Sequence, residues 1–226
     1  MDHIREHRSI LAHVEKRLLV YTAARLPRSI TSDHLTGLAL VAMVGAGAAF
    51  AAIHVAWWTA GLFIFALAVN WFGDSLDGTV ARVRNQQRPR YGYYVDHVVD
   101  LAGTTAIVAG MAASGVMSPA IAGVLLAAYC LVSAESYLAT HSLGVFRISF
   151  AGIGPTELRI ILGVGAVAVA RDPWVDLAGR RLFLLDVGGI VASVGLMAAF
   201  AASAIRNTRA LYAADPIPRG EGERAA

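Results

Sequence analysis

Six long apolar runs, separated by charged segments, dominate this sequence of 226 residues. They cover residues 35–56, 57–72, 93–114, 119–141, 155–171 and 183–205, the fifth being short. A helix needs about 20 apolar residues to cross the hydrocarbon core of a bilayer. Only 15% of the residues are charged, whereas a soluble domain carries about 25%. The pattern predicts an all-α integral membrane protein with six transmembrane helices. The small residues in "GAGAAFAA" and "GMAASG" predict close contacts between these helices.

Arginine marks one side of the predicted membrane domain. Basic residues precede the first run, separate the second from the third and the fourth from the fifth, and follow the sixth. The segments after the first and third runs contain neither arginine nor lysine. By the positive-inside rule, both termini are expected in the cytoplasm. One segment departs from this pattern, because residues 171–181 carry three arginines on the predicted outer side. The length and topology suggest a bacterial inner (plasma) membrane, and the basic charge predicts attraction to phosphates, with no nucleic acid as partner.

The chain divides into three predicted parts. Residues 1–34 form a cytoplasmic amphipathic segment, residues 35–206 the transmembrane domain, and residues 207–226 a polar tail expected to be disordered. Within residues 3–24, apolar side chains recur at helical spacing between arginines, which predicts an amphipathic helix at the cytoplasmic interface. An ordinary solvated helix packed on the domain is the alternative. The opening segment is too charged for a cleavable signal peptide, and a single cysteine, Cys130, excludes a disulfide framework.

Four aspartates border the second and third runs and form two helical stripes. The first stripe is Asp74, Asp77, Gly78 and Ala81, at i, i+3, i+4 and i+7, and the second is Gly92, Asp96 and Asp100, at intervals of four. The linker between them contains Pro89 and is cationic, which is typical of a turn joining two antiparallel helices. The carboxylates are therefore expected to face one another near the cytoplasmic surface. A set of surface aspartates at helix ends is the alternative.

Such a cluster needs positive charge, because neighbouring carboxylates raise one another's pKa. Hard oxygen ligands favour Mg²⁺, Mn²⁺ or Ca²⁺, and four carboxylates can hold two ions of the kind that act on phosphate oxygens. The small residues on the same stripes leave room for a ligand beside the backbone. Arg82 follows directly and is suited to binding phosphate.

The series Asp74-x-x-Asp77-Gly78-x-x-Ala81-Arg82, nine residues, Gly92-x-x-x-Asp96-x-x-x-Asp100 resembles the signature of the CDP-alcohol phosphotransferase family. Its middle spacer is one residue longer than the commonest form. Six spans, a cytoplasmic motif and an N-terminal interfacial helix also agree with that family. The resemblance implies an enzyme that cleaves the pyrophosphate of a CDP-linked donor, passes the phosphoryl-linked group to an alcohol and releases CMP. Homodimers are common among its members.

The resemblance also implies roles for individual residues. Asp74, Asp77 and Asp96 would ligate two divalent ions, usually Mg²⁺, with Mn²⁺ as the other candidate. Asp100 would complete the metal site and act as the general base for the acceptor hydroxyl group. The cytidine-diphosphate pocket would be lined by Asp77, Gly78, Ala81, Arg82 and Gly92.

Other polar residues give weaker signals. Glu157 and Arg159 are candidates for the acceptor site because they lie on the predicted cytoplasmic side, although Pro155 and Glu157 also suit helix initiation. Glu135, alone in the fourth run, either contacts the acceptor or hydrogen-bonds to a neighbouring helix. For His97 a helix–helix hydrogen bond is favoured, and His141 is a weaker candidate. Before the first run, Ser32 or Asp33 is expected to cap the helix.

Two alternatives to the main functional hypothesis stay open. The main hypothesis is transfer of a phosphatidyl group from CDP-diacylglycerol to a small hydroxyl compound such as an inositol phosphate, glycerol phosphate, serine or choline. In the first alternative, CDP-choline or CDP-ethanolamine is the donor and diacylglycerol the acceptor. The stretches "DHVVD" and "GPTE" favour this alternative. The second is a six-span divalent-cation transporter, which would place its carboxylates near mid-membrane rather than at helix ends.

Overall fold

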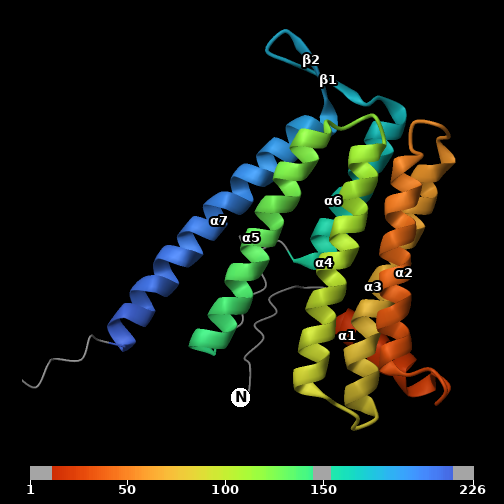
Figure 1. The fold of residues 1–226 in the computed structure, drawn as a ribbon. Helices are drawn as coiled ribbons and strands as arrows, with labels where there is room; N and C mark the ends of the chain where they lie inside the picture. Colours follow the sequence, from red (N-terminus) through yellow and green to blue (C-terminus); the bar gives the residue numbers. More distant parts are fainter. Residues whose placement is uncertain (1–11, 145–153, 216–226) are drawn as a thin grey trace, which may run out of the picture.

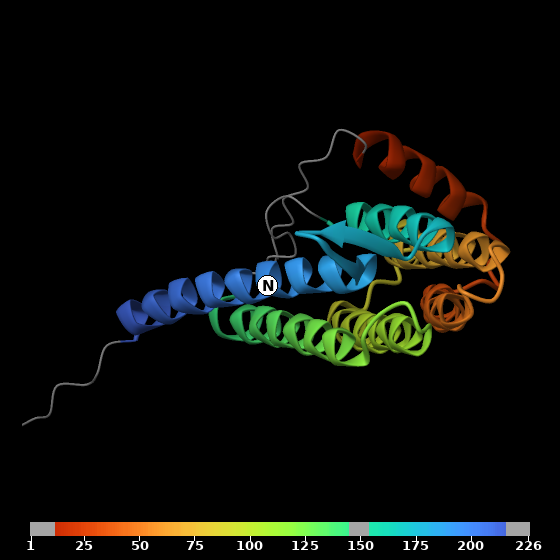
Figure 2. The same cartoon turned by 90° about the horizontal axis from the view of Figure 1, so that it is seen from above.

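The computed structural model describes residues 12–144 and 154–215, which form a helical bundle with one small hairpin (Figure 1 and Figure 2). The elements are, in order, α1 (Ala12–Arg25), α2 (Ser32–Ala51), α3 (Trp58–Val83), α4 (Pro89–Ala113), α5 (Pro119–Leu143), α6 (Pro155–Arg171), β1 (Trp174–Leu177), β2 (Arg180–Phe183) and α7 (Leu184–Ala214).

Five of the described helices are long and apolar enough to cross a membrane, namely α2, α3, α4, α5 and α7. They confirm the predicted all-α membrane fold. The fifth predicted run coincides with α6, which has 17 residues and packs beside α3. A helix of that length reaches about 26 Å, slightly less than the bilayer core. The sixth crossing therefore stays a prediction.

The helix ends differ from the predicted runs in three places. The first run was expected to reach residue 56, but α2 ends at Ala51 and a turn precedes α3. The second run stops at residue 72, and α3 continues to Val83, as the aspartate stripe required. The prediction of disorder from residue 207 is wrong for the described part, since α7 extends to Ala214. The alanines and leucine near that end favour helix. The rest of the predicted tail lies outside the described residues.

Glycines set the distance between α2 and α4. A Cβ atom added at Gly110 of α4 would lie 2.0 Å from the carbonyl oxygen of Gly47 in α2, and one added at Gly47 would lie 2.3 Å from the carbonyl oxygen of Ala106. On the other side of α2, a Cβ atom at Gly73 of α3 would lie 2.7 Å from the carbonyl oxygen of Leu35. These contacts confirm the close approach predicted from the small residues.

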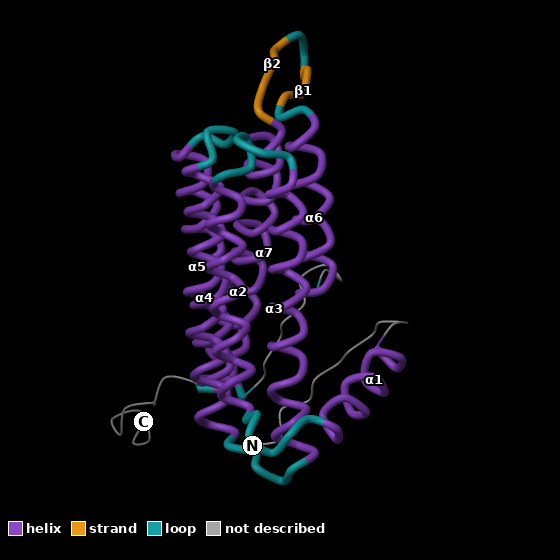
Figure 3. The backbone as a smooth tube through the Cα atoms, turned by 90° about the vertical axis from the view of Figure 1, so that its right-hand side faces the viewer, coloured by secondary structure: helices purple, strands orange, loops and turns teal. Residues whose placement is uncertain are grey.

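Helix α1 lies against the end of the bundle where α3 ends (Figure 3). Ala23 is buried there in a cluster with Leu35, Leu76 and Val80. Leu18 and Tyr21 are instead 55% and 58% exposed. One face of α1 therefore packs on the domain, and the other leaves apolar side chains uncovered by protein, as an interfacial helix requires.

At the opposite end, β1 and β2 form a hairpin that projects beyond the helices (Figure 1). Sequence reasoning expected only a loop over residues 171–181. The turn consists of Ala178 and Gly179, with φ values of 51° and 75°, and such a two-residue turn suits a hairpin. Trp174 stacks on Phe183 across the strands, with ring centroids 4.2 Å apart. Strands of only four residues give too little alternation to be recognised in sequence.

Candidate active site

The structure brings all four predicted aspartates together. Asp74 and Asp77 lie on the last turns of α3, and Asp96 and Asp100 lie in the first half of α4. The charge of Asp77 interacts with those of Asp74 and Asp96, and the charge of Asp100 interacts with all three others. The four side chains are only partly exposed. The four carboxylates therefore lie within electrostatic reach of one another, at the end of the bundle that also holds α1 (Figure 3).

Asp77 is held from both sides of its carboxylate. The hydroxyl group of Thr36 in α2 donates a hydrogen bond of 2.6 Å to Oδ2, and the amide of Gly78 donates to Oδ1. Ser32 donates to the backbone carbonyl of the same residue at 2.9 Å. Helix α2 thereby fixes the orientation of a carboxylate on α3. Sequence reasoning missed Thr36, because nothing in the spacing of α2 indicates which turn of α3 lies beside it.

The N-cap predicted for the first span is wrong by one or two residues. Thr31 caps α2 by accepting a hydrogen bond of 3.3 Å from the amide of His34, and the His34 ring accepts from the amide of Thr31 at 3.2 Å. The two residues that were predicted to cap the helix, Ser32 and Asp33, make other contacts instead. Ser32 binds α3, and Asp33 forms an exposed salt bridge with Arg88 of the α3–α4 turn, with one N–O distance of 2.7 Å.

Arg159 joins the carboxylates from α6. Its guanidinium group donates a hydrogen bond of 2.7 Å to Oδ2 of Asp74 and one of 2.9 Å to the side-chain oxygen of Asn70. The buried Asn70 amide in turn donates to the carbonyl oxygen of Ala39 in α2 at 3.2 Å. The proposed site residue Arg159 is thus brought to the cluster. Asn70 was missed, although an amide inside the apolar run "ALAVNWF" was the signal.

Asp100 also faces α5. Its charge interacts with the hydroxyl groups of Tyr129 and Tyr137, neither of which sequence reasoning selected. The Nδ1 atom of His97 donates a hydrogen bond of 2.6 Å to the carbonyl oxygen of Tyr93, and the His97 ring meets that of Tyr137 edge-on at 4.7 Å. These two contacts join His97 to its own helix and to α5, and the helix–helix hydrogen bond favoured for it stays a prediction.

The residues expected at the nucleotide lie beside the aspartates on α3 and α4. The guanidinium group of Arg82 donates to the hydroxyl of Thr79 at 3.0 Å and lies 3.4 Å from the position of a Cβ atom at Gly78. Ala81 is partly exposed, and no atom lies within 4 Å of a Cβ atom placed at Gly92. A cavity of about 450 Å³ opens at the same end. Its lining consists of Thr31, Ser32, Asp33, Gln86, Gln87 and Arg88.

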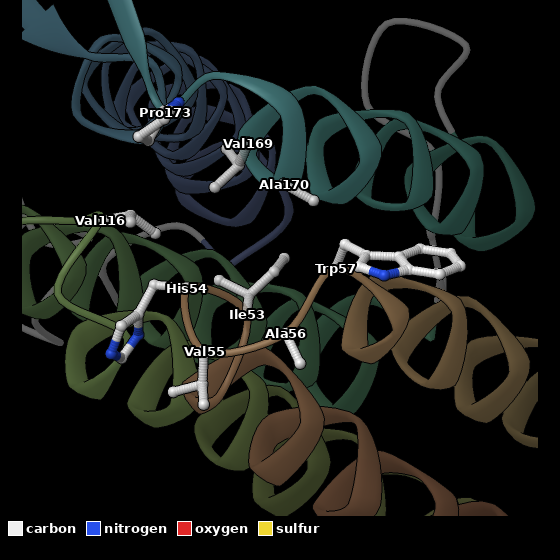
Figure 4. A pocket seen from close by; sticks show the side chains of 9 residues that line it. All are labelled: Ile53, His54, Val55, Ala56, Trp57, Val116, Val169, Ala170 and Pro173. Atoms are coloured by element: carbon white, nitrogen blue, oxygen red, sulfur yellow. The ribbon is translucent and has the colours of Figure 1, made fainter.

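A second cavity, of about 220 Å³, lies at the far end of the bundle (Figure 4). Turn residues 53–57 form one wall, and Val116, Val169, Ala170 and Pro173 form the others. It contains no carboxylate, and its one titratable side chain is that of His54. It is therefore separate from the aspartate cluster.

Two of the three remaining candidates, Glu135 and Glu157, have structural partners. Glu135 accepts a hydrogen bond of 2.7 Å from Asn207 of α7, which is the helix–helix contact left open by the sequence. Glu157 accepts one of 3.0 Å from the amide of Gly154 and so caps the start of α6. His141 is exposed in the last turn of α5.

The donor chemistry of the aspartate cluster fits a hard divalent cation, since it offers four carboxylates and no thiolate. The four carboxylates are not arranged as a metal site in this structure. Within residues 12–144 and 154–215, no group of three acidic, histidine or cysteine side chains is close enough to hold a metal ion. Asp74 is turned to Arg159, and Asp77 to Thr36. Metal binding at these residues would require the side chains to rearrange.

Comparison with known proteins identifies the family to which the chain belongs. No curated protein matches it in sequence. The family described as CDP-alcohol phosphatidyltransferase matches residues 29–201, well over half of the chain, and this range contains the whole aspartate cluster. Members of this family act in membranes on a CDP-linked donor and an alcohol acceptor, and they generally use divalent metal ions. The chain therefore belongs to the CDP-alcohol phosphatidyltransferase family and is a membrane-embedded transferase of substituted phosphate groups in phospholipid biosynthesis.

Proposed function

We propose that the protein transfers a phosphatidyl group from CDP-diacylglycerol to a small hydroxyl acceptor. The acceptor oxygen bonds to the phosphorus that carries diacylglycerol, and the bond from this phosphorus to the bridging oxygen breaks. CMP leaves with that oxygen, and the acceptor proton passes to a carboxylate. The observation that carries this proposal is the meeting of four aspartates of α3 and α4 at one end of the bundle, within the segment that matches the family.

Each part of the site has a proposed task. Asp74, Asp77 and Asp96 hold divalent ions, Mg²⁺ in the first place, which would neutralise the pyrophosphate when bound. Asp100 is the general base that accepts the acceptor proton. It suits this task because it lies where the carboxylates of α3 and the hydroxyl groups of α5 meet.

The CDP group is proposed to lie beside Gly78, Ala81, Arg82 and Gly92. The open space at Gly92 and the polar cavity at the α3–α4 turn support this placement, because a nucleotide needs room beside the backbone. Arg82 is suited to a phosphate oxygen. Of the three proposed acceptor-site residues, Arg159 contacts a proposed metal ligand, since its guanidinium group reaches Asp74.

The assay uses purified protein in detergent with Mg²⁺ and measures CMP release. CDP-diacylglycerol is offered with a mixture of small alcohols, and CDP-choline or CDP-ethanolamine is offered separately with diacylglycerol. We expect CMP and a new phospholipid only from CDP-diacylglycerol. Product from the water-soluble donors alone would reverse the assignment of donor and acceptor, and CMP from neither donor would contradict the proposed reaction.

The proposed orientation puts both termini and the aspartates in the cytoplasm of a bacterial cell. It is tested by labelling single cysteines with a membrane-impermeant maleimide, in a Cys130→Ala background. Gln86→Cys reports on the α3–α4 turn, and Leu177→Cys reports on the hairpin. We expect intact cells to label only Leu177→Cys, and labelling of only Gln86→Cys would invert the topology.

A further inference from the structure

We infer that a row of hydroxyl groups on α5 binds the acceptor alcohol, and that this acceptor carries no phosphate group. The row, called here the hydroxyl face, consists of Tyr129, Ser133 and Tyr137, together with Thr104 on α4. This inference rests on the proposed function and deepens it by naming the acceptor's place and chemical class.

The hydroxyl face is one continuous stripe between two helices. Tyr129, Ser133 and Tyr137 are spaced by four residues, so they lie above one another on the same side of α5. The Tyr129 hydroxyl is hydrogen-bonded to Thr104 on α4 and to Ser133, which is also hydrogen-bonded to Tyr137. The stripe therefore faces α4 and presents linked donors and acceptors along its length.

The stripe runs alongside the proposed catalytic base, because Asp100 lies on α4 between Thr104 and His97, whose ring meets that of Tyr137 at 4.7 Å. Both phenol groups interact with the charge of Asp100, and the same carboxylate interacts with Asp74, Asp77 and Asp96 on its other side. Since the side towards α3 is assigned to the ions and the donor, the acceptor hydroxyl group must reach Asp100 from another direction. The hydroxyl face is the polar surface that borders Asp100 on the α5 side.

Helix-to-helix bonding is the simpler role for such groups in a membrane. Helix α5 makes a helix-to-helix bond of this kind elsewhere, because its Glu135 accepts a hydrogen bond from Asn207 of α7. Its amino end is also tied to α7, because Asp186 accepts from the amide of Ser118 at 2.7 Å. The hydroxyl face differs from these bonds because it adjoins Asp100 of the aspartate cluster, and polar groups inside a membrane protein mark substrate pathways.

Among the described residues, the two helices that carry the hydroxyl face offer little positive charge for a phosphate on the acceptor. Helix α5 contains no arginine or lysine, and α4 contains only Arg90, in its first turn. Arg159, whose charge acts on Asp100, is already bound to Asp74 and Asn70. Phosphate recognition in proteins relies on such cations. Neutral hydroxyl groups beside carboxylates suit a neutral or cationic alcohol instead.

The first experiment compares matched acceptors with CDP-diacylglycerol and Mg²⁺: glycerol with glycerol 3-phosphate, and inositol with inositol phosphate, with serine and choline added. We expect CMP release with unphosphorylated acceptors and less than about a tenth of that rate with the phosphorylated partners. Faster turnover of a phosphorylated partner overturns the inference while leaving the proposed reaction intact. CMP release from no combination would instead contradict the proposed function itself.

The second experiment removes single hydroxyl groups through Tyr129→Phe and Tyr137→Phe, with Tyr94→Phe as the matched control. Tyr94 lies on α4 and is 68% exposed. Because each site variant loses one neutral hydrogen bond to the acceptor, we expect it to raise KM for the acceptor by about three- to tenfold. KM for CDP-diacylglycerol should change less than about twofold, and the control should match the wild type.

A purely structural face gives a different result. Equal changes in both KM values, or a lower Tm with an unchanged acceptor KM, overturn the inference. Ser133→Thr keeps the hydroxyl group and Ser133→Ala removes it, so a binding role predicts that only Ser133→Ala raises the acceptor KM. Their small volume change keeps this pair informative if either phenylalanine variant fails to fold.

Discussion

Arg159 of α6 donates a hydrogen bond of 2.7 Å to Asp74 of α3, although the two residues lie 85 positions apart. The guanidinium group stands among carboxylates that would otherwise repel one another. A positively charged side chain in this place both restrains Asp74 and competes with a divalent ion for it.

Replacing Arg159 with methionine is expected to raise the affinity for Mg²⁺ and lower kcat for CMP release by about tenfold, because Asp74 is freed but loses its orientation. Isothermal titration with Mg²⁺ in detergent measures the first effect, and the CMP assay measures the second. Arg171→Met, at the opposite end of α6, is the control. An unchanged Mg²⁺ affinity would show that the ion pair is unrelated to metal binding.

Replacing Thr36 with valine removes the 2.6 Å hydrogen bond to Asp77 at nearly constant volume. Groups that orient a metal ligand typically contribute 10- to 100-fold in metal affinity or activity, so we expect a loss of about tenfold in kcat/KM. Thr105→Val is matched to it, since Thr105 is exposed and donates only to the Leu101 carbonyl oxygen. Similar losses in both variants would point to a general effect of threonine on helix packing.

Replacing Asp77 with alanine is expected to abolish CMP release, because its carboxylate is a proposed metal ligand and its site is anchored by Thr36 and Gly78. Mg²⁺ should then no longer raise Tm, whereas it should do so in the wild type by binding the folded state. Asp215→Ala, at the exposed end of α7, should behave as wild type. Retained turnover in Asp77→Ala would remove this residue from the site.

Replacing Asp100 with asparagine keeps the shape of the side chain and removes its ability to accept a proton. If Asp100 is the base, kcat should fall by about 100-fold or more, while the dissociation constant of CDP-diacylglycerol changes little. Single-turnover assays and equilibrium donor binding separate the two quantities. Equal losses of binding and turnover would identify Asp100 chiefly as a metal ligand.

Replacing Gly110 with alanine forces a Cβ atom to within 2.0 Å of the Gly47 carbonyl oxygen. Overpacking of this kind costs about 1–3 kcal/mol, so we expect a lower Tm in detergent. Gly123→Ala on α5 is the control, since no atom lies within 4 Å of its added Cβ atom. A Tm for Gly110→Ala equal to that of this control would mean that α2 and α4 separate at little cost.

Much of the fold could be predicted because it depends on local periodicity. Apolar runs determine where membrane helices form, since every backbone polar group must be satisfied within its own helix. The aspartates at Asp74, Asp77, Asp96 and Asp100 fall on two stripes for the same reason, because helical geometry assigns each spacing to a face. The errors lie at ends. The N-cap at Thr31 differs by one or two residues, which costs little, and α7 continues to Ala214, well beyond the predicted end of its apolar run.

The contacts that complete the site were decided only by tertiary structure. Thr36, Asn70, Arg159 and Tyr129 come from four different helices, and no periodicity within one helix tells which turn of another lies beside it. That register depends on side-chain packing across interfaces, such as the Gly47–Gly110 contact. The sequence alone determined the membrane helices and the two carboxylate stripes, whereas packing decided which polar side chains surround those carboxylates, because relative helix position is a property of the whole bundle.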